Sequence, residues 1–306
     1  MPEPYSVFIG DVALDEYYKA DYWPTIQDKA LVDALPATPG GMIANAACVS
    51  AALGMNVKFM AALNSGAITQ FLLDDLNKSG VDTSLVVFDD NLADSKTMIF
   101  LVGNEHTVLI PRLGLEQIEL TRNQLDTLAR SQYIYSTPAE IATLHCGVMD
   151  SEDIIDHCRK NGVKLVFDVD VDYTRDGSEE RYKRLDILFF NEAGFDRYRG
   201  SLSQRTAVDR LLGYGLELVI VTLAENGCVV YSQSESITSP AFNVDIMDVT
   251  GAGDTFCSSF VFALSLGKGI KYAAEFANAA ASICVSRLGA RAGAVSRQEI
   301  ERIIRL

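Results

Sequence analysis

The sequence is poor in the residues that build metal centres. It has 3 His and 6 Cys among 306 residues, and no His is spaced with another His, a Cys or a carboxylate in a recognised zinc pattern. The cysteines show no C-x-x-C spacing and sit mostly in apolar stretches, where thiols behave as small hydrophobic groups. They are Cys48, Cys146, Cys158, Cys228, Cys257 and Cys284. We therefore expect reduced thiols, no transition-metal site and a cytoplasmic location.

Positive charge is also scarce. The chain has 26 Lys and Arg against 41 Asp and Glu, a formal net charge of -15. No basic stripe is present that could release counterions from a nucleic acid or attract an anionic membrane. The chain shows no signal-peptide pattern and no apolar run of bilayer-spanning length. We expect neither nucleic-acid nor membrane partners.

What the sequence does contain is a regular alternation of short apolar runs and helical patterns. The expected strands cover residues 6–10, 57–62, 132–135, 163–168, 187–191, 217–222, 228–231 and 242–246. The expected helices cover 43–53, 68–79, 151–161 and 203–213, and residues 252–306 read as almost wholly helical. Such alternation predicts an α/β protein with a mainly parallel sheet covered by helices on both faces.

Two segments interrupt this alternation. Residues 12–36 are polar and aromatic, and residues 96–102 and 106–111 flank a Gly-Asn turn that predicts a β-hairpin. Together they predict a small sheet beside the main one. This sheet is either an ordinary surface excursion or a lid that closes over a ligand and excludes water, and the residues alone leave both readings open.

The segment DVTGAGDTF at 248–256 carries the clearest chemical signal. It follows a strand and begins an apolar helix, so Gly251, Ala252 and Gly253 let backbone N–H groups converge where a helix N-terminus favours negative charge. Phosphate oxygens fit such a turn. Asp254 adds a carboxylate that can deprotonate an acceptor hydroxyl. The alternative is that Asp254 only caps the helix and the glycines only form a turn.

The same segment resembles the D-T-x-G-A-G-D signature of the PfkB/ribokinase family of carbohydrate kinases, with Val249 at the usual Thr position. Other motifs occur in the family's order along nearly the whole chain. The resemblance implies a ribokinase-like three-layer αβα sandwich with a small β-sheet lid. It implies one domain over residues 1–306, with lid segments at about 12–36 and 96–111.

The resemblance also implies the reaction, which is ATP-dependent phosphorylation of a hydroxyl on a sugar or sugar derivative, with Mg²⁺. Asp254 would be the general base, and the Gly251–Gly253 turn would be the anion hole. A small-molecule sugar and ATP are the expected partners. A homodimer formed through the lid is a further expectation.

The substrate side of the site is implied by two further motifs. Asp15 in IGDVALDEYY resembles the family's substrate-binding aspartate, and GGMIAN, from Gly40 and Gly41 to Asn45, resembles the sugar-binding G-G-x-x-x-N motif. Glycine allows close backbone approach, while Asp15 and Asn45 provide acceptor and donor groups suited to a polyol. Residues 168–175 resemble the D-x-N-x-R stretch of fructokinase and ketogluconate kinase relatives. The basic side chains expected to meet an acidic group of the substrate are Arg112, Arg175 and His106.

Motifs for the nucleotide follow in the second half. VTLAENG resembles the family's T-L-G-x-x-G loop, with Ala224 in place of its first glycine, so Thr222 and Gly227 are expected at ATP. Asn278 resembles a residue of the helix that borders the adenine. Asn191 belongs to the same expected ATP site, because it begins a segment that resembles the N-x-x-E motif.

That motif organises Mg²⁺ and phosphate through water, and here the sequence departs from it. Gly194 occupies the usual glutamate position, so Glu192 would substitute in part, or ATP and water would supply most of the magnesium shell. The resemblance also implies two loops whose carbonyl groups hold a monovalent cation such as K⁺. Their residues are Asp248, Thr250 and Gly289.

Two other functions remain open at this stage. A nucleoside kinase of the same superfamily would stack a base on aromatic side chains of the lid, and Tyr17, Tyr18, Tyr22 and Trp23 are available for this. A non-catalytic sensor of sugars or nucleotides would explain the missing N-x-x-E glutamate and the altered VTLA loop. The segment AALNSGAITQ replaces a common G-x-D-x-x-G run, and the sequence does not identify the acceptor.

Overall fold

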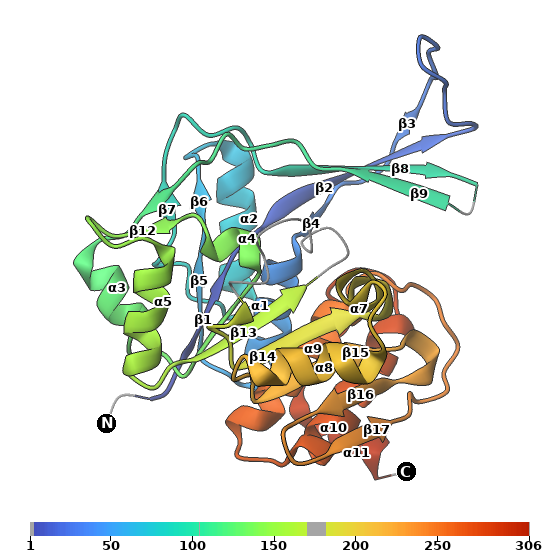
Figure 1. Ribbon diagram of the computed structural model, residues 1–306. Helices are drawn as coiled ribbons and strands as arrows, with labels where there is room; N and C mark the ends of the chain where they lie inside the picture. The colour runs from blue at the N-terminus through green and yellow to red at the C-terminus, as the bar shows by residue number, and fades with distance from the viewer. Residues whose placement is uncertain (1–2, 104, 170–181, 306) are drawn as a thin grey trace.

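A central eight-stranded sheet dominates the computed structural model, which describes residues 3–103, 105–169 and 182–305 (Figure 1). The strand order is β17-β16-β15-β14-β13-β11-β1-β5, parallel from β5 to β15 and antiparallel at β16 and β17. The strands are β1 (Ser6–Ile9), β5 (Val57–Met60), β11 (Tyr133–Ser136), β13 (Lys164–Val169), β14 (Ile187–Asn191), β15 (Leu218–Thr222), β16 (Cys228–Tyr231) and β17 (Ser236–Ser239). The predicted mainly parallel sheet is confirmed.

Helices cover both faces because successive strand residues point to opposite sides. In β1, Phe8 joins one core and Val7 and Ile9 join the other. The Phe8 core contains residues of α1 (Met42–Leu53), α2 (Ala67–Lys78), α9 (Ala252–Ser265), α10 (Ile270–Val285) and α11 (Arg297–Ile304). The other contains residues of α3 (Arg122–Leu128), α4 (Pro138–Ile141), α5 (Ser151–Lys160), α7 (Glu192–Arg199) and α8 (Gln204–Gly213). This is the predicted three-layer αβα sandwich.

A second, five-stranded sheet extends away from the main one, at the upper right of Figure 1. Its strands are β2 (Ala13–Ala20), β3 (Asp33–Ala34), β4 (Thr38–Gly40), β8 (Lys96–Val102) and β9 (Glu105–Leu109). The predicted hairpin is present as the antiparallel pair β8 and β9, and β2 pairs with β8 in parallel. Two short parallel pairs, β6 (Ala62–Leu63) with β7 (Val87–Phe88) and β10 (Ile118–Glu119) with β12 (Leu144–His145), lie outside both sheets.

The prediction of a strand at residues 242–246 is wrong, because that segment has no regular secondary structure. The last strand is β17, which pairs antiparallel with β16. A local turn explains why β17 is the last strand. The Ser232 N–H donates to the Glu235 carbonyl at 2.9 Å, and this turn returns the chain directly onto β16. Pro240 follows β17 and has no N–H with which to continue the ladder. Residues 252–306 are mainly helical, with a break between α10 and α11.

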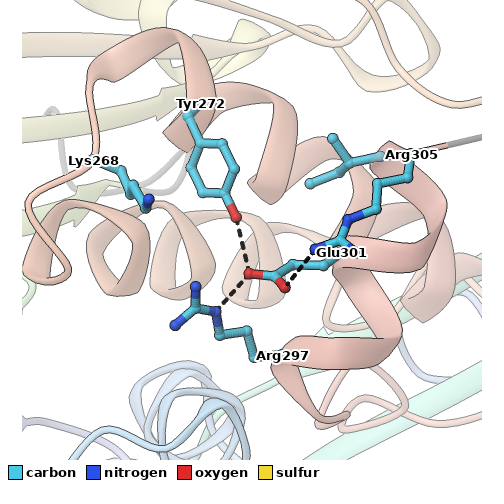
Figure 2. A pocket seen from close by; sticks show the side chains of 6 residues that line it. Lys268, Tyr272, Arg297, Glu301 and Arg305 are labelled. Atoms are coloured by element: carbon cyan, nitrogen blue, oxygen red, sulfur yellow. Dashed lines mark hydrogen bonds and ion pairs between the residues drawn. The ribbon is translucent and has the colours of Figure 1, made fainter.

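The last helices enclose a hollow of about 330 Å³, shown in Figure 2. It is lined by Lys268, Tyr272, Arg297, Glu301, Ile304 and Arg305. Its central carboxylate is already engaged, because Glu301 accepts hydrogen bonds from Tyr272 at 3.3 Å and Arg297 at 2.6 Å. None of the residues that the sequence places in the site lines this hollow.

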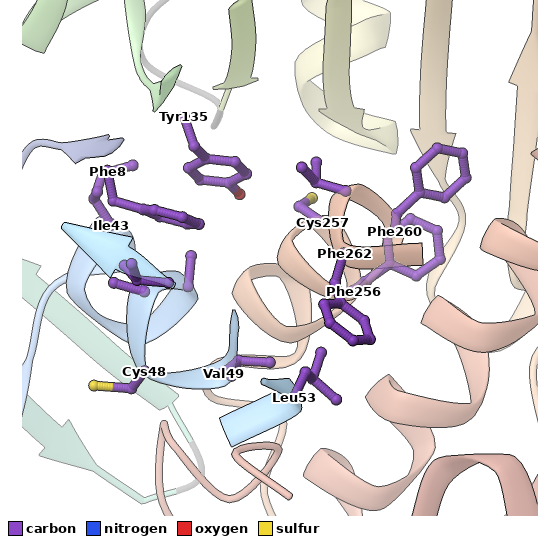
Figure 3. Packing of buried hydrophobic residues seen from close by; sticks show 14 of the residues in the cluster. Phe8, Ile43, Cys48, Val49, Leu53, Tyr135, Phe256, Cys257, Phe260 and Phe262 are labelled. Atoms are coloured by element: carbon purple, nitrogen blue, oxygen red, sulfur yellow. The ribbon is translucent and has the colours of Figure 1, made fainter. Parts of the chain in front are cut away.

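Packing between α1 and α9 brings together parts of the chain that are distant in sequence. Figure 3 shows Ile43 and Val49 of α1 and Phe256 and Phe260 of α9, which are all buried in one core. All six cysteines are buried and unpaired. The contact aligns the first turns of the two helices, and both turns carry motif residues.

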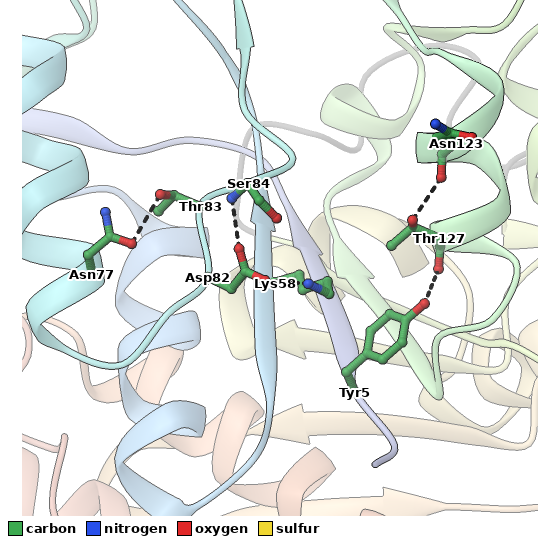
Figure 4. A network of polar contacts seen from close by, with 8 residues as sticks. All are labelled: Tyr5, Lys58, Asn77, Asp82, Thr83, Ser84, Asn123 and Thr127. Carbon is green, nitrogen blue, oxygen red and sulfur yellow. Dashed lines mark hydrogen bonds and ion pairs between the residues drawn. The ribbon is translucent and has the colours of Figure 1, made fainter. Parts of the chain in front are cut away.

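A polar network holds the start of the chain against its neighbours (Figure 4). Tyr5 donates its hydroxyl to the Thr127 carbonyl at 2.8 Å. Lys58 pairs with Asp82, which also accepts the Ser84 N–H at 2.8 Å. Burial opposes ionisation of Asp82, but Lys58 and Ser84 outweigh it and hold the pKa of Asp82 below its ordinary value.

Candidate active site

Asp254 and Asn45 meet where α9 and α1 begin. The Asn45 Nδ2 group donates to Asp254 Oδ2 at 2.9 Å, although the two residues are 209 positions apart. Asn45 is buried and Asp254 is half-buried. The expected sugar-binding asparagine and the expected general base are therefore direct neighbours.

The first turn of α9 is exposed at Gly253 and partly buried at Gly251, Ala252 and Asp254. Gly251 is the N-cap with φ +76°, and a Cβ there would lie 1.8 Å from the Ala290 carbonyl oxygen, so only glycine fits. No side chain caps the helix, and a Cβ at Gly253 would meet nothing within 4 Å. Open N–H groups at a helix N-terminus can hold phosphate oxygens. The N-cap position belongs to Gly251 rather than Asp254, which disfavours the reading of Asp254 as the helix cap.

Gly40 and Gly41 allow the chain to pass closely over Asp15. A Cβ at Gly40 would lie 2.0 Å from Asp15 Oδ2, and one at Gly41 would lie 2.7 Å from the Val12 Cα. Gly41 also has φ +100°, which favours glycine. Strand pairing sets this contact, because β4 runs antiparallel to the start of β2. Asp15 is buried under this segment.

Three carboxyl groups gather on this side of the site. Burial raises the pKa of Asp15 to about 6, against a hydrogen bond from Thr97 that lowers it. Asp11 accepts the Met42 and Ile43 N–H groups at 2.9 and 3.0 Å, and so places its charge at the N-terminus of α1. Burial, with a smaller effect of Asp11, raises the pKa of Glu140 to about 7. Sequence reasoning missed Asp11 and Glu140.

Arg291 is the third residue that sequence reasoning missed. Its Nε donates to Asn45 Oδ1 at 3.0 Å, its Nη2 donates to the Gly40 carbonyl at 3.4 Å, and its Nη1 pairs with Asp75 of α2. Little in the sequence pointed to Arg291. It lies two residues after Gly289, in a loop that was considered only for its backbone carbonyl groups. Of the basic side chains expected at the substrate, His106 is exposed on β9, Arg112 lies exposed beyond that strand, and Arg175 lies outside the described residues.

The expected ATP residues Asn191 and Thr222 lie side by side at the carboxyl ends of β14 and β15. Asn191 Oδ1 accepts the Gly194 N–H at 2.7 Å and caps α7. A Cβ at Gly194 would lie 3.1 Å from that oxygen, so a side chain there would crowd the cap. Glu192 is exposed. Among the described residues, no group of three or more His, Cys, Asp or Glu side chains is placed to hold a metal ion.

Gly227 and Asn278 both contact the end of β17. Gly227 has φ +84°, and a Cβ there would lie 2.1 Å from the Ser239 carbonyl oxygen. Asn278 is buried and donates to the Ser239 hydroxyl and carbonyl at 3.0 and 3.1 Å, so it anchors this strand. A hollow of about 280 Å³ includes Ser239 in its lining. The position expected to border the adenine is thus next to a hollow.

Asp248 joins the two loops that were expected to hold a monovalent cation. It accepts the Thr250 and Gly289 N–H groups, both at 2.9 Å. Burial opposes ionisation, yet these N–H groups hold the pKa of Asp248 below its ordinary value. Cys284 lies behind the site and donates its thiol to the Thr250 carbonyl at 3.5 Å. The carboxylate therefore ties the loops together.

A carboxylate beside a helix N-terminus provides a proton acceptor and backbone donors, the two groups that phosphoryl transfer to a hydroxyl requires. Residues 4–297 match the pfkB family carbohydrate kinase, and the chain belongs to this family of transferases. Among the residues that the structure describes, none of the helices has both the length and the apolar content needed to cross a membrane.

Similar proteins include several sugar kinases. The chain is 27% identical to 5-dehydro-2-deoxygluconokinase of Bacillus subtilis, over 87% of this chain and 86% of that protein. It is 26% identical to the ribokinase of the same organism, over 97% and 98%. Its fold is similar to that of Arabidopsis thaliana ribokinase complexed with ribose and ATP, with a TM-score of 0.85, 23% identity and 99% of each chain covered.

Proposed function

We propose that the protein transfers the γ-phosphoryl group of ATP to a hydroxyl of a sugar or sugar derivative, with Asp254 as the general base. The observation that carries this proposal is the position of Asp254, in the first turn of a helix whose N-terminus is open. Support also comes from the relatives, which include ribokinases, fructokinase and 5-dehydro-2-deoxygluconokinases.

The acceptor would lie between Asp254 and the segment around Asp15. Asp15, Asn45 and the backbone of Gly40 and Gly41 would bind its hydroxyl groups. Asp254 takes the proton of the reacting hydroxyl as that oxygen attacks the γ-phosphorus. The small sheet would act as a lid that keeps water away from the transferring group.

The first turn of α9 would stabilise the charge of the moving phosphoryl group. Its N–H groups come from Gly251, Gly253 and Ala252, of which the Ala252 N–H makes a long turn hydrogen bond of 3.3 Å to the Val249 carbonyl, and the backbone fixes their positions before transfer. The remaining ATP contacts would come from Asn191, Thr222, Gly227 and Asn278. Mg²⁺ would enter bound to the phosphates, with Glu192 beside its water shell.

A monovalent cation is a separate part of the proposal. Its site would be formed by the two loops that Asp248 joins through Thr250 and Gly289. Because Asp248 is already engaged by two N–H groups, the backbone carbonyl groups of the loops would be the ligands. Activity with K⁺ compared with activity in a tetramethylammonium buffer tests this part.

The experiment that tests the function is an ADP-release assay with ATP, Mg²⁺ and K⁺. The acceptors are D-ribose, D-fructose, sugar acids, sugar phosphates and nucleosides, each offered separately. We expect release with a sugar or sugar derivative. Release with nucleosides alone would instead identify a nucleoside kinase. ATP binding without release on any acceptor would identify a non-catalytic sensor.

Two of the four aromatic residues considered for stacking on a nucleoside base, Tyr18 and Trp23, pack against another ring of the protein. Tyr18 stacks on Phe100 with ring centroids 5.3 Å apart, and Trp23 meets the same ring edge-on at 5.5 Å. These rings pack against one another. A nucleoside base would have to compete with these contacts.

A further inference from the structure

Both polar atoms of the Asn45 side chain are engaged, and by groups of opposite character. Its Nδ2 donates to the Asp254 carboxylate at 2.9 Å, and its Oδ1 accepts from Arg291 Nε at 3.0 Å. A primary amide can rotate by about 180° about its Cβ–Cγ bond, and this rotation exchanges the positions of the oxygen and the nitrogen. Turned over, its oxygen would face a carboxylate and its NH₂ group would face a guanidinium, so both hydrogen bonds would be lost.

Arg291 is held firmly enough to select one orientation. Its side chain is only 16% exposed, and its guanidinium also pairs with Asp75 and donates to the Gly40 carbonyl. The planar fork of an arginine reaches α1, α2 and the end of β4 at once. A lysine has one nitrogen and cannot reproduce this geometry.

We propose that Arg291 is a positioning residue, which holds the Asn45 amide so that its NH₂ group faces Asp254 and the acceptor site, and that Asp75 anchors it. This inference rests on the proposed function, because the orientation matters for catalysis only if Asp254 and Asn45 act on the acceptor. Arg291 needs no contact with the acceptor. It acts through Asn45.

The first test requires no substrate. In protein labelled with ¹⁵N at asparagine, the side-chain NH₂ signal of Asn45 is assigned by its loss in Asn45→Ala, and its exchange with water is measured. We expect Arg291→Ala to speed this exchange about tenfold, the scale of one hydrogen bond to a charged group. Arg291→Lys should behave almost like Arg291→Ala.

The matched control is Arg287→Ala, an arginine of the same loop that pairs with Glu299 and is 47% exposed. It should leave the Asn45 signal unchanged. Unchanged exchange in Arg291→Ala would overturn the proposal, and so would equal changes in Arg291→Ala and Arg287→Ala. Since this measurement involves no turnover, its outcome is separate from the success or failure of the proposed function.

The second test uses the acceptor that gives the highest ADP release. Arg291→Ala should lower kcat/KM for that acceptor about 10- to 100-fold and leave the KM for ATP within about twofold, because the lost hydrogen bonds lie on the acceptor side. Asp75→Asn should have a smaller effect in the same direction, since Arg291 keeps its bond to Asn45.

A double-mutant cycle decides whether Arg291 works through Asn45. If it does, Arg291→Ala should reduce kcat/KM by less than about threefold further in an Asn45→Ala background. Full additivity of the two losses would contradict a positioning role. A loss of ATP affinity as large as the loss for the acceptor would contradict it as well.

Discussion

At the scale of single residues, Asp15 is expected to bind the substrate, but its buried carboxylate lowers the stability of the protein. Its carboxyl group is buried, and its pKa of about 6 exceeds the value of about 3.9 for an unfolded aspartate. The unfolded chain therefore ionises more easily, so the free energy of unfolding falls as pH rises from about 4 to about 6 and stays lower above.

Asp15→Asn removes this penalty and keeps an oxygen that can accept from Thr97. We expect the variant to be more stable than the wild type by about 1–2 kcal/mol at pH 7.5 and equally stable at pH 4. The KM for the acceptor should rise, with little change in the KM for ATP. Thermal unfolding at the two pH values checks the first expectation. A variant less stable than the wild type at pH 7.5 would contradict it.

Ala224 carries backbone strain at the position where the family motif has glycine. Its φ is +48°, a conformation that costs an L-residue about 1–2 kcal/mol. We expect Ala224→Gly to raise the free energy of unfolding by about 0.5–1 kcal/mol. The gain is smaller than the strain that is relieved, because glycine also has more entropy in the unfolded chain. Urea unfolding measures the change. The control is Gly200→Ala, where φ is +50° and the opposite change should appear.

Single residues also show how far the sequence could be interpreted. Asp15, Asn45 and Asp254 could be named as candidates because each belongs to a short motif, and they stay predictions. Arg291 could not, because its partners Asn45 and Asp75 lie 246 and 216 positions away. No local pattern reports contacts over such separations. They depend on how α1, α2 and the loop before α11 pack.

At the scale of elements, the N-terminus of α9 contains two glycines with different roles. Gly251→Ala should lower stability by more than about 2 kcal/mol, because its Cβ would collide with the Ala290 carbonyl in a strained conformation. Gly253→Ala should leave stability within about 0.5 kcal/mol and weaken ATP turnover, because its Cβ would enter the open space in front of the helix. Unfolding curves and ADP release separate the two effects. Equal stability of both variants would contradict this account.

The elements themselves were largely predictable, and the errors have local causes. Buried parallel strands such as β14 and β15 are apolar up to their last residue, which made them easy to recognise. β17 was missed because Ser236–Ser239 is polar, and its pairing depends on the turn before it. Residues 242–246 were predicted as the last strand instead, because they contain more apolar residues than Ser236–Ser239.

At the scale of the whole molecule, the segments next to the small sheet expose apolar side chains that suggest a partner surface: Ile26 and Leu31 lie between β2 and β3, and Ile110 follows β9. Ile26, Leu31 and Ile110 are 95%, 98% and 72% exposed. The edges of this sheet also offer unpaired backbone groups. We expect a homodimer formed through the small sheet.

Light scattering after size exclusion tests this expectation. The wild type should have about twice the mass of the 33.4 kDa chain. Leu31→Glu combined with Ile110→Glu should give a monomer, while Val148→Glu, at a side chain that is 96% exposed outside the small sheet, should not. A wild type that is monomeric at micromolar concentration would contradict the expectation.

The central claim is that Asp254 is the general base, and Asp254→Asn tests it most directly. Asparagine keeps the size of the side chain and can still accept the Asn45 hydrogen bond, but it cannot take a proton. We predict that kcat falls about 10²- to 10⁴-fold, the usual scale of general acid–base catalysis, while the KM values for acceptor and ATP change only a few-fold. A folded Asp254→Asn protein that turns over at nearly the wild-type rate would contradict the account.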